Sequence, residues 1–454
     1  MKVPERLGLP SVKAARAALA AHLAVQKGEG LRGAVADALA SKEAKGLGGK
    51  ERRFVVVAVR GLSRHLRRVD AAARGLGHPP GTLGLEEDRA LVRWVLWRRL
   101  FTGADWKAVG PEVRLPGPVR PRTVPDALLE KMMTAPLPPG PEVLSEGDPV
   151  ERAAAVHSFP NWLARAVADE VGEARAEAVL ASLNEEPEVF LRVRSGQTPE
   201  QVREALAGEG VETARVPWAP SALKVTSGGL KVFDTRPMRE RRLQVQEPGS
   251  QLIALACAGA ERVVDYCAGA GGKTLALAEL VGSGGVVDAH DRSARRLGEA
   301  RRRVKEAGLS PAQVRFPQEI GPSLQSADTV LVDAPCSGTG SLAREPEQKW
   351  RLTAEKVRAF AKTQREILSD VAPKMKAGAR LVYATCSVLR EEDEAVVEAF
   401  LAAHSEWRVE PLREVLPPEC APVLDGEGRF LRVWPDLSGA GGFFAARLVK
   451  GLAG

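Results

Sequence analysis

The sequence predicts an α/β fold in which a mostly parallel, doubly wound sheet forms the C-terminal half of the chain. Strand and helix patterns alternate from about residue 246 onward, which is typical of parallel strands joined by helices. The first 110 residues lack strand patterns and repeat apolar residues at helical spacing. With 454 residues the chain is too long for one ordinary core, so two or three domains are expected.

Composition narrows the class of protein. Hydrophobic residues make up 44% of the chain and charged residues 27%, as in soluble globular proteins. No apolar run approaches the ~20 residues of a membrane span, and the N-terminus lacks the apolar core of a signal peptide. We therefore expect a cytoplasmic protein without membrane contact.

The net charge of +7 favours a nucleic-acid partner. Arginine clusters such as 295–296 and 301–303 could meet a phosphate backbone. The alternative is a solvated helix face in a chain that generally prefers arginine to lysine. Charge alone therefore decides little.

The cysteine content argues against disulfide and metal frameworks. The chain has an odd number of cysteines, no Cys-x-x-Cys pair and few histidines. We expect free thiols in a reducing compartment, no metal and a monomer. The five cysteines are Cys257, Cys267, Cys336, Cys386 and Cys420.

Residues 1–140 are predicted to form a helical domain that ends in a proline-rich linker. Ser11 can cap a first helix, and residues 31–46 and 51–61 are expected to form two more. Trp94, Trp97 and Phe101 share one helix stripe, which favours a place in the core. Proline and glycine are dense over residues 111–149, interrupted by a short helical pattern at 126–133.

Residues 141–245 are predicted to form a small α/β domain. Helical patterns at 160–171, 174–184 and 198–210 alternate with strand patterns at 188–195, 211–218 and 222–227. Arg192 and Arg194 on the first strand could meet phosphate, and a solvated strand face is an equal alternative. Nothing in this domain suggests catalysis.

Residues 246–454 are predicted to contain the large sheet and the site. Strand patterns end at polar residues, and the last two resemble a hairpin. Long amphipathic helices are expected over residues 353–376 and 391–404. The predicted strands lie at 262–267, 284–291, 328–335, 379–386, 429–435 and 442–450.

Two of these strands end in a cysteine. Residues 330–340 read VLVDAPCSGTG and residues 380–387 read RLVYATCS, so Cys336 and Cys386 follow neighbouring strand ends, with Asp333 beside them. Ligands bind at the carboxyl edge of such sheets. A single cysteine would more often be a buried apolar residue. Methylation of a pyrimidine at C5 needs a thiolate at C6 and an acid near N3, and this set of residues can supply both.

The glycine-rich loop at residues 267–274 predicts a nucleoside site. A phosphate-binding P-loop needs a glycine where Cys267 stands, so an NTPase is disfavoured, and a dinucleotide motif would need a glycine at Thr274. A short glycine turn remains, and Asp291 follows ~20 residues later, where a carboxylate typically holds ribose hydroxyls. This combination suits S-adenosyl-L-methionine, although a purely structural turn stays possible.

The two cysteine motifs carry a family resemblance. DAPCSGTG and VYATCSVLREEDE resemble the paired motifs of the Nop/Sun RNA cytosine-5 methyltransferases. The resemblance implies a Rossmann-like class I methyltransferase domain over residues 246–454. The helical front resembles the NusB-like RNA-binding domain of the bacterial rRNA methyltransferase B branch, which implies 16S rRNA as substrate.

The resemblance also implies roles for individual positions. Cys386 resembles the nucleophile, Cys336 the cysteine that assists product release, and Asp333 and Lys273 the pair that lines the target-base pocket. Residues 344–350 resemble a substrate loop and residues 245–252 the entry segment. The positions that resemble the binding site for S-adenosyl-L-methionine are Cys267, Ala268, Gly269, Ala270, Gly271, Gly272, Lys273, Asp291, Gln318 and Asp333.

Three departures from the family pattern stand out. Ala270 replaces a usual proline, which predicts a more flexible loop. Gln318 replaces an acid, and its amide oxygen can still accept a hydrogen bond. Pro248-Gly249 replaces a plainer pair. The rival hypothesis is a non-catalytic rRNA-binding assembly factor, and titration with S-adenosyl-L-methionine would separate the two.

Overall fold

The chain folds into two compact units. The computed structural model describes residues 10–114, 121–138, 140 and 147–452, so parts of the proline-rich run lie outside the described residues. The helical unit comprises Met1–Glu186 together with Leu342–Leu352, and the sheet unit comprises Pro187–Ser341 and Thr353–Gly454. The domain boundaries predicted after residues 140 and 245 stay predictions.

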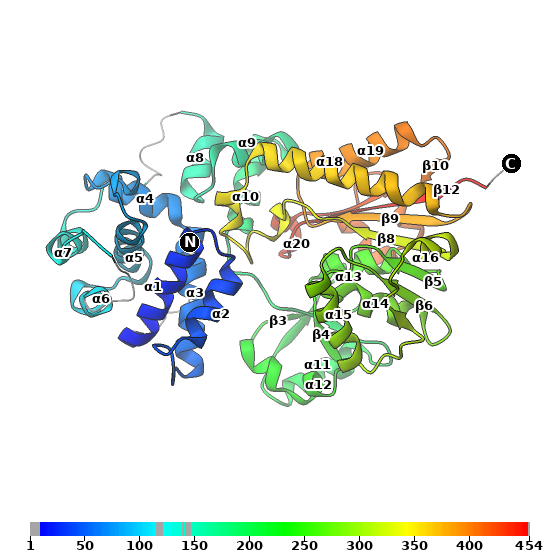
Figure 1. The fold of residues 1–454 in the computed structure, drawn as a ribbon, viewed down its shortest axis with the longest axis horizontal. Helices are drawn as coiled ribbons and strands as arrows, with labels where there is room; N and C mark the ends of the chain where they lie inside the picture. Colours follow the sequence, from blue (N-terminus) through cyan, green and yellow to red (C-terminus); the bar gives the residue numbers. More distant parts are fainter. Residues whose placement is uncertain (1–9, 115–120, 139, 141–146, 453–454) are drawn as a thin grey trace. The chain divides into compact units, whose positions relative to one another are not determined.

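The helical unit is built around one apolar core. Helix α5 lies at its centre, because Trp94 and Trp97 are almost fully buried there. Residues 51–61 lie within α3, which confirms the helix expected there. The helices are α1 (Val12–Gln26), α2 (Leu31–Ala40), α3 (Gly49–Arg64), α4 (Leu66–Gly75), α5 (Glu86–Thr102), α6 (Trp106–Val113), α7 (Asp126–Thr134), α8 (Pro149–Val156), α9 (Asn161–Val171), α10 (Glu173–Leu183) and α17 (Gln348–Arg351) (Figure 1).

The proline-rich region contains a helix that packs into the core of the helical unit. The predicted short helix is α7, and Leu129, Met132 and Met133 on it belong to the core of the helical unit. The short helix predicted at 126–133 is therefore confirmed, and the connector expected on either side of it stays a prediction. Burial of these three large side chains stabilises the helix by about several kcal/mol, which outweighs the unfavourable effect of the nearby prolines on helix formation.

Residues 342–352 belong to the helical unit although they follow a strand of the large sheet. Lys349 is 1% exposed, and its Nζ donates to the Arg64 carbonyl at 2.9 Å and to Asn184 Oδ1 at 2.8 Å. Burial lowers the pKa of Lys349 well below its usual value. The Trp350 indole donates to the Ser63 carbonyl at 2.7 Å. The segment that resembles a substrate loop is thus packed and contains α17, and its role toward the substrate stays a prediction.

The sheet unit begins with a small antiparallel sheet in the order β2-β3-β1-β4. Its strands are short, and β4 was absent from the predicted strands. Helix α11 (Pro199–Ala207) begins with a capping box from Thr198 and Gln201. The strands are β1 (Phe190–Val193), β2 (Thr213–Arg215), β3 (Ala222–Val225) and β4 (Leu243–Val245), and α12 spans Arg236–Arg239.

The large sheet has eight strands in the order β10-β12-β9-β8-β5-β6-β7, with β11 paired to β12. Strands β5 to β9 run parallel, as predicted, while β12 pairs antiparallel with β9. The predicted hairpin-like pair is confirmed as β11 and β12. The strands are β5 (Arg262–Asp265), β6 (Val286–Ala289), β7 (Val314–Arg315), β8 (Thr329–Asp333), β9 (Arg380–Thr385), β10 (Trp407–Val409), β11 (Phe430–Val433) and β12 (Phe443–Lys450).

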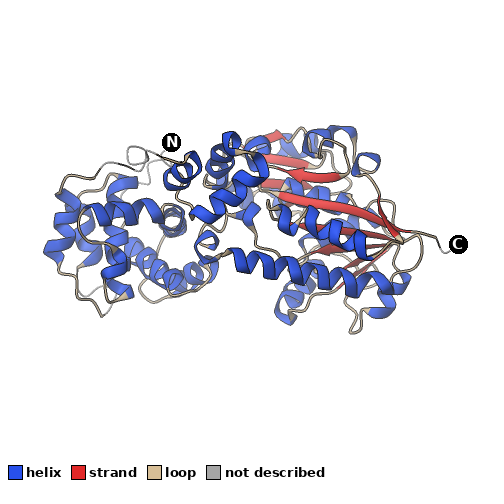
Figure 2. Ribbon diagram, turned by 90° about the horizontal axis from the view of Figure 1, so that it is seen from above, coloured by secondary structure: helices blue, strands red, loops and turns tan. Residues whose placement is uncertain are grey.

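Helices cover both faces of this sheet, which confirms the doubly wound α/β class (Figure 2). Along β8, Leu331 faces one apolar core and its neighbours Val330 and Val332 face the other. One face carries α13 (Pro248–Leu255), α14 (Gly272–Val281) and α15 (Ala294–Glu306), and the other carries α16 (Gly321–Ser326), α18 (Ala354–Val371) and α19 (Glu394–Ala403).

None of the helices in the described part of the chain combines the length and the apolar character that crossing a membrane would need.

Candidate active site

Two thiols meet at the carboxyl edge of the large sheet. Strands β8 and β9 are parallel neighbours, so the loops that follow them leave the same edge. Cys336 Sγ and Cys386 Sγ lie 3.4 Å apart. The Gly340 amide donates to the Cys386 carbonyl at 2.9 Å, which holds the first loop against the second. The predicted pairing of the cysteines is thus present in the fold.

The two thiols differ in acidity. With Cys336 as donor, their hydrogen bond lowers the pKa of Cys386. Nearby Ser341 and Lys273 also lower this pKa, whereas burial and the Asp333 carboxylate raise it. The same hydrogen bond, together with burial, raises the pKa of Cys336 well above its usual value. Because thiolate is the reactive form, a hydrogen bond donated by Cys336 favours Cys386 as the thiolate of the pair.

An ion pair faces the thiols. Lys273 Nζ, at the start of α14, lies 2.7 Å from Asp333 Oδ2 at the end of β8. Burial would lower the pKa of Lys273, but the Asp333 carboxylate outweighs it and raises that pKa. Lys273 therefore remains a cation in a largely enclosed position, and its effect on the pKa of Cys386 is opposed by the Asp333 carboxylate.

The glycine loop is fastened to the end of β6. Asp291 Oδ2 accepts from the Gly269 amide at 2.9 Å, and Asp291 Oδ1 accepts from the Ser293 amide at 2.7 Å. The Ala268 amide donates to the His290 carbonyl at 2.8 Å. Asp291 thus orients the loop, and it stands where the sequence analysis placed it.

The chain resembles known families over most of its length. The family described as 16S rRNA methyltransferase RsmB/F matches residues 252–449, and an RsmF/B-like ferredoxin-like domain matches residues 159–231. The chain is 32% identical over 315 residues to the Probable ribosomal RNA small subunit methyltransferase B of Bacillus subtilis (strain 168), covering 67% of this chain and 69% of that protein. The ribosomal RNA small subunit methyltransferase B of Pseudomonas syringae pv. tomato is 33% identical over 313 residues, covering 67% of this chain and 68% of that protein.

The chain belongs to the RsmB/F methyltransferase family. The expected resemblance to the Nop/Sun family and its RsmB-like branch is thereby confirmed. Among solved structures, that of the protein PH0851 is 26% identical, with a TM-score of 0.77 over 98% of this chain and all of that chain. The crystal structure of a methyltransferase homologue from Pyrococcus horikoshii is 25% identical with a TM-score of 0.56, covering 67% of this chain and 99% of that chain.

This RsmB/F member braces its altered glycine loop from outside. Arg303 Nη1, on α15, donates to the carbonyl of Ala270 at 3.1 Å, at the position where proline is usual. Gly271 has φ +82°, and a side chain there would approach Ala300 Cβ to 3.0 Å. Arg303 thus restrains the loop at the position where a proline is usual. Gln318 lies exposed in the loop after β7.

Asp265 is a site residue that the sequence analysis missed. It ends β5 at 0% exposure, and its Oδ2 accepts from Thr274 Oγ1 at 2.7 Å. Its Oδ1 has no partner within the described chain, and burial raises its pKa to about 7. A buried carboxylate with a spare acceptor beside a glycine loop points to a polar ligand group. The available signal was an acid at a strand end, one residue before Tyr266-Cys267.

Two glycines in the site allow close backbone approach. A Cβ on Gly340 would lie 2.2 Å from the Gly442 carbonyl oxygen, in the turn before β12. A Cβ on Gly249 would lie 2.4 Å from the Phe443 ring. The departure at Pro248-Gly249 therefore has a packing reason, because α13, which contains Gly249, lies against Phe443 at the start of β12.

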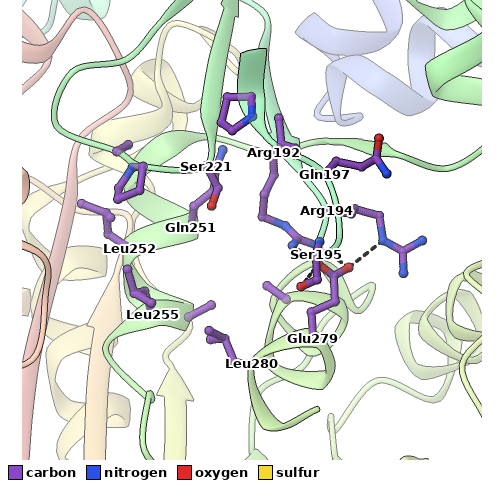
Figure 3. Close-up of a pocket in the computed structure, with 16 residues that line it drawn as sticks. Arg192, Arg194, Ser195, Gln197, Ser221, Gln251, Leu252, Leu255, Glu279 and Leu280 are labelled. Carbon is purple, nitrogen blue, oxygen red and sulfur yellow. Dashed lines mark hydrogen bonds and ion pairs between the residues drawn. The ribbon is translucent and has the colours of Figure 1, made fainter. Parts of the chain in front are cut away.

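A pocket lies beside the small sheet (Figure 3). Glu279 on α14 accepts from Arg192 at 2.6 Å and from Arg194 at 2.6 Å, and Figure 3 shows both guanidinium groups turned toward this carboxylate. Arg192 is only 6% exposed. Both alternatives offered for these arginines, phosphate contact and a solvated strand face, are therefore wrong for Arg192.

The described residues contain no group of three or more histidine, cysteine, aspartate or glutamate side chains that could hold a metal ion.

Proposed function

We propose that the chain methylates C5 of a cytosine in rRNA, with S-adenosyl-L-methionine as methyl donor. The observation that carries the proposal is the contact between Cys336 and Cys386, in which the second thiol has the lowered pKa. A methyl transfer to a heteroatom would need no cysteine nucleophile. Carbon 5 of a cytosine does need one, because it becomes nucleophilic only after a thiolate adds to C6.

The residues then divide the work. Cys386 attacks C6 as a thiolate, and the ion pair of Lys273 and Asp333 delivers a proton to N3 as the bond between Cys386 and C6 forms, so that negative charge does not build up on the ring. Transfer of the methyl group to C5 leaves a proton on that carbon. Removal of this proton allows the bond between Cys386 and C6 to break. Cys336, in contact with Cys386, assists this release as a thiolate that accepts the C5 proton and becomes a thiol, after losing its own proton to solvent, while the C5–C6 double bond re-forms and Cys386 leaves as a thiolate.

The residues at the glycine loop fit a bound nucleoside with a charged amino-acid portion. Asp291 can hold ribose hydroxyls while it orients Gly269. Asp265 offers a buried, unpartnered acceptor oxygen. S-adenosyl-L-methionine supplies an electrophilic methyl group when bound, and the chain's part is to hold it at the sheet edge that also carries the thiols. Cys267, Ala268, Ala270, Gly271, Gly272, Gln318 and Asp333 complete the proposed binding set.

The RNA substrate is proposed from the relatives and from charge. Both relatives named above are ribosomal RNA small subunit methyltransferases, and the net charge of +7 suits a polyanion. Helix α15 displays exposed arginines at 295, 296, 301 and 302. These can contact phosphates without contributing to catalysis.

The test uses Cys336→Ala and Cys386→Ala with a 16S rRNA transcript and methyl-labelled donor. Cys336→Ala should attack and transfer the methyl group, and then stall as a slow-migrating protein–RNA adduct on a denaturing gel. Cys386→Ala and the double variant should give neither an adduct nor methylation. The opposite pattern would exchange the two roles, while methylation by Cys386→Ala would refute the mechanism.

The target base is tested separately in cells. Bisulfite sequencing of rRNA from a strain that lacks the gene should lose one or more protected cytosines, and expression of the chain should restore them. Unchanged protection would refute the cytosine assignment. Calorimetric titration with S-adenosyl-L-methionine tests the rival hypothesis, because an assembly factor without cofactor binding would release no heat.

A further inference from the structure

One buried carboxylate links both cysteine loops. Glu392, in the 3₁₀ turn before α19, is 0% exposed. Its Oε1 accepts from the Ser337 amide at 2.8 Å, and its Oε2 accepts from the hydroxyls of Ser337 and, at 2.9 Å, Ser387. Ser337 directly follows Cys336 and Ser387 directly follows Cys386. A single side chain therefore holds the residue next to each thiol.

A small buried network surrounds this carboxylate. Thr339 Oγ1 lies 3.0 Å from Ser387 Oγ, and Gln364 Nε2 on α18 donates to Glu392 Oε1 at 3.1 Å and to the Pro335 carbonyl at 3.0 Å. These hydrogen-bond partners are neutral donors, and burial raises the pKa of Glu392. The group is therefore costly to bury, which a purely apolar contact between the loops would avoid.

The network stands behind the thiols and does not compete with them. Ser337, Ser387 and Glu392 are buried, whereas Cys336 and Cys386 are partly exposed. A substrate that reaches the thiols need not touch Glu392. We propose that Glu392 is a positioning residue that sets the separation and orientation of the Cys336–Cys386 pair. This inference rests on the proposed function, in which both thiols take part in one reaction.

Thiol separation can be measured without RNA. Phenylarsine oxide bridges two adjacent thiols by forming two As–S bonds and releasing water, so its affinity reports the geometry of the pair. The wild-type chain should bind one equivalent and protect both Cys336 and Cys386 from alkylation. Glu392→Ala should bind the arsenical at least ~10-fold more weakly, because a two-sulfur bridge tolerates little change in geometry. Equal affinity in the folded variant would overturn the inference.

Kinetics supply the second readout. Glu392→Ala should lower kcat by ~100-fold, the scale expected when reacting groups are misplaced by about 1 Å, with the KM for S-adenosyl-L-methionine nearly unchanged. Glu392→Gln should recover most of both losses, because an amide can still bond both serines. A rise in KM with unchanged kcat, or no rescue by glutamine, would contradict a positioning role.

The matched control is Glu410→Ala. Glu410 accepts from Arg380 at 3.0 Å, at the start of β9, and so braces the same strand at its other end. This variant should bind the arsenical like wild type, and an equal loss would show that the Glu392 effect is unspecific. If Glu392→Ala does not fold, Ser337→Ala and Ser387→Ala each remove part of the network, and wild-type arsenical affinity in both would overturn the inference.

The two proposals fail in different ways. If Cys386→Ala still methylates cytosine, the proposed role of Cys386 as nucleophile is refuted, while arsenical binding still measures the geometry of the thiol pair. If the cysteine variants behave as proposed but Glu392→Ala keeps wild-type arsenical affinity and kcat, only the positioning role falls.

Discussion

The difference in acidity between the two thiols leads to a test at the scale of single residues. The largest cause of the lowered pKa of Cys386 is the hydrogen bond from Cys336. Cys336→Ala removes this donor, so the pKa of Cys386 should rise and its thiolate fraction at a given pH should fall. The pH profile of Cys386 alkylation by iodoacetamide, followed by peptide mass spectrometry, should therefore move to higher pH.

The control for this profile is Cys420→Ala, because Cys420 is fully buried and takes no part in the hydrogen bond between Cys336 and Cys386. Its loss should leave the alkylation profile of Cys386 in place. A profile of Cys336→Ala that coincided with wild type, or that moved to lower pH, would contradict the assigned donor.

Asp291 gives a second test at this scale. Asp291→Ala removes both the proposed ribose contact and the hydrogen bond that orients Gly269. Binding of S-adenosyl-L-methionine should weaken by about 1–3 kcal/mol, the range for a charge-assisted hydrogen bond. Calorimetry measures the dissociation constant, and Gln318→Ala, at the exposed loop position, shows how far that residue contributes. An unaltered constant for Asp291→Ala would show that the ribose carboxylate lies elsewhere.

Single residues were predictable where their type is tied to a strand end. Cys336, Cys386 and Asp333 could be placed together because parallel strands share a carboxyl edge, whereas Lys273, at the start of α14, was predicted from the family resemblance. Glu392 could not be predicted, because its function depends on side chains that approach it from two loops and from α18. An acid in an acidic run, as in residues 391–394, gives no sign of burial.

At the scale of elements, the close approach of two backbone segments at Gly340 and Gly442 is the most sensitive point. Gly340→Ala would press a methyl group against a carbonyl oxygen, which cannot move aside like a flexible side chain. We expect a loss of more than about 2 kcal/mol in the free energy of unfolding. Chemical denaturation measures it. Gly298→Ala, on α15 with open space around it, is the matched control and should be neutral or stabilising by up to ~1 kcal/mol.

Elements were predictable where they are long and periodic. The parallel strands β5, β6, β8 and β9 follow from apolar runs, and α18 follows from helical spacing. By contrast, β7 has two residues and β4 has three, which is too short to show a period. Such strands form because a neighbouring strand offers hydrogen bonds. Helix α7 was found, but its burial was not, because proline density signals a turn and says nothing about what the helix contacts.

At the scale of the whole molecule, the helical unit and the segment 342–352 are tested together. Deleting residues 1–140 should weaken RNA binding and reduce its salt dependence, while binding of S-adenosyl-L-methionine remains and reports that the sheet unit is folded. The same deletion removes Arg64 and Ser63, which accept hydrogen bonds from Lys349 and Trp350. Trypsin should therefore cleave after Lys349 in the truncated chain and not in the intact chain.

Cleavage in α15, where Arg295 and Arg302 are exposed in both chains, is the internal standard. Unchanged RNA affinity and salt slope would contradict a role of the helical unit in binding. Continued protection at Lys349 would show that the segment does not depend on residues 1–140 for its packing.

The membership of residues 342–352 in the helical unit could not be predicted from the sequence. The run REPEQKW is polar, so it has the composition of an exposed loop. Its Lys349 is buried by partners more than 160 positions away, Arg64 and Asn184. Sequence patterns report on residues that are close along the chain, whereas the hydrogen bonds of Lys349 join residues that only folding brings together.

That membership also bears on the order in which the protein is made. Domains usually fold as they leave the ribosome, beginning with the N-terminal one. Here Lys349 and Trp350 are synthesised only after most of the sheet unit has been translated. Until then the Arg64 and Ser63 carbonyls cannot accept the hydrogen bonds that these two side chains donate in the folded protein. The apolar core of this unit, formed by residues 14–133, can close early, whereas the hydrogen bonds to the Arg64 and Ser63 carbonyls form only after β8 and the first cysteine loop have been synthesised.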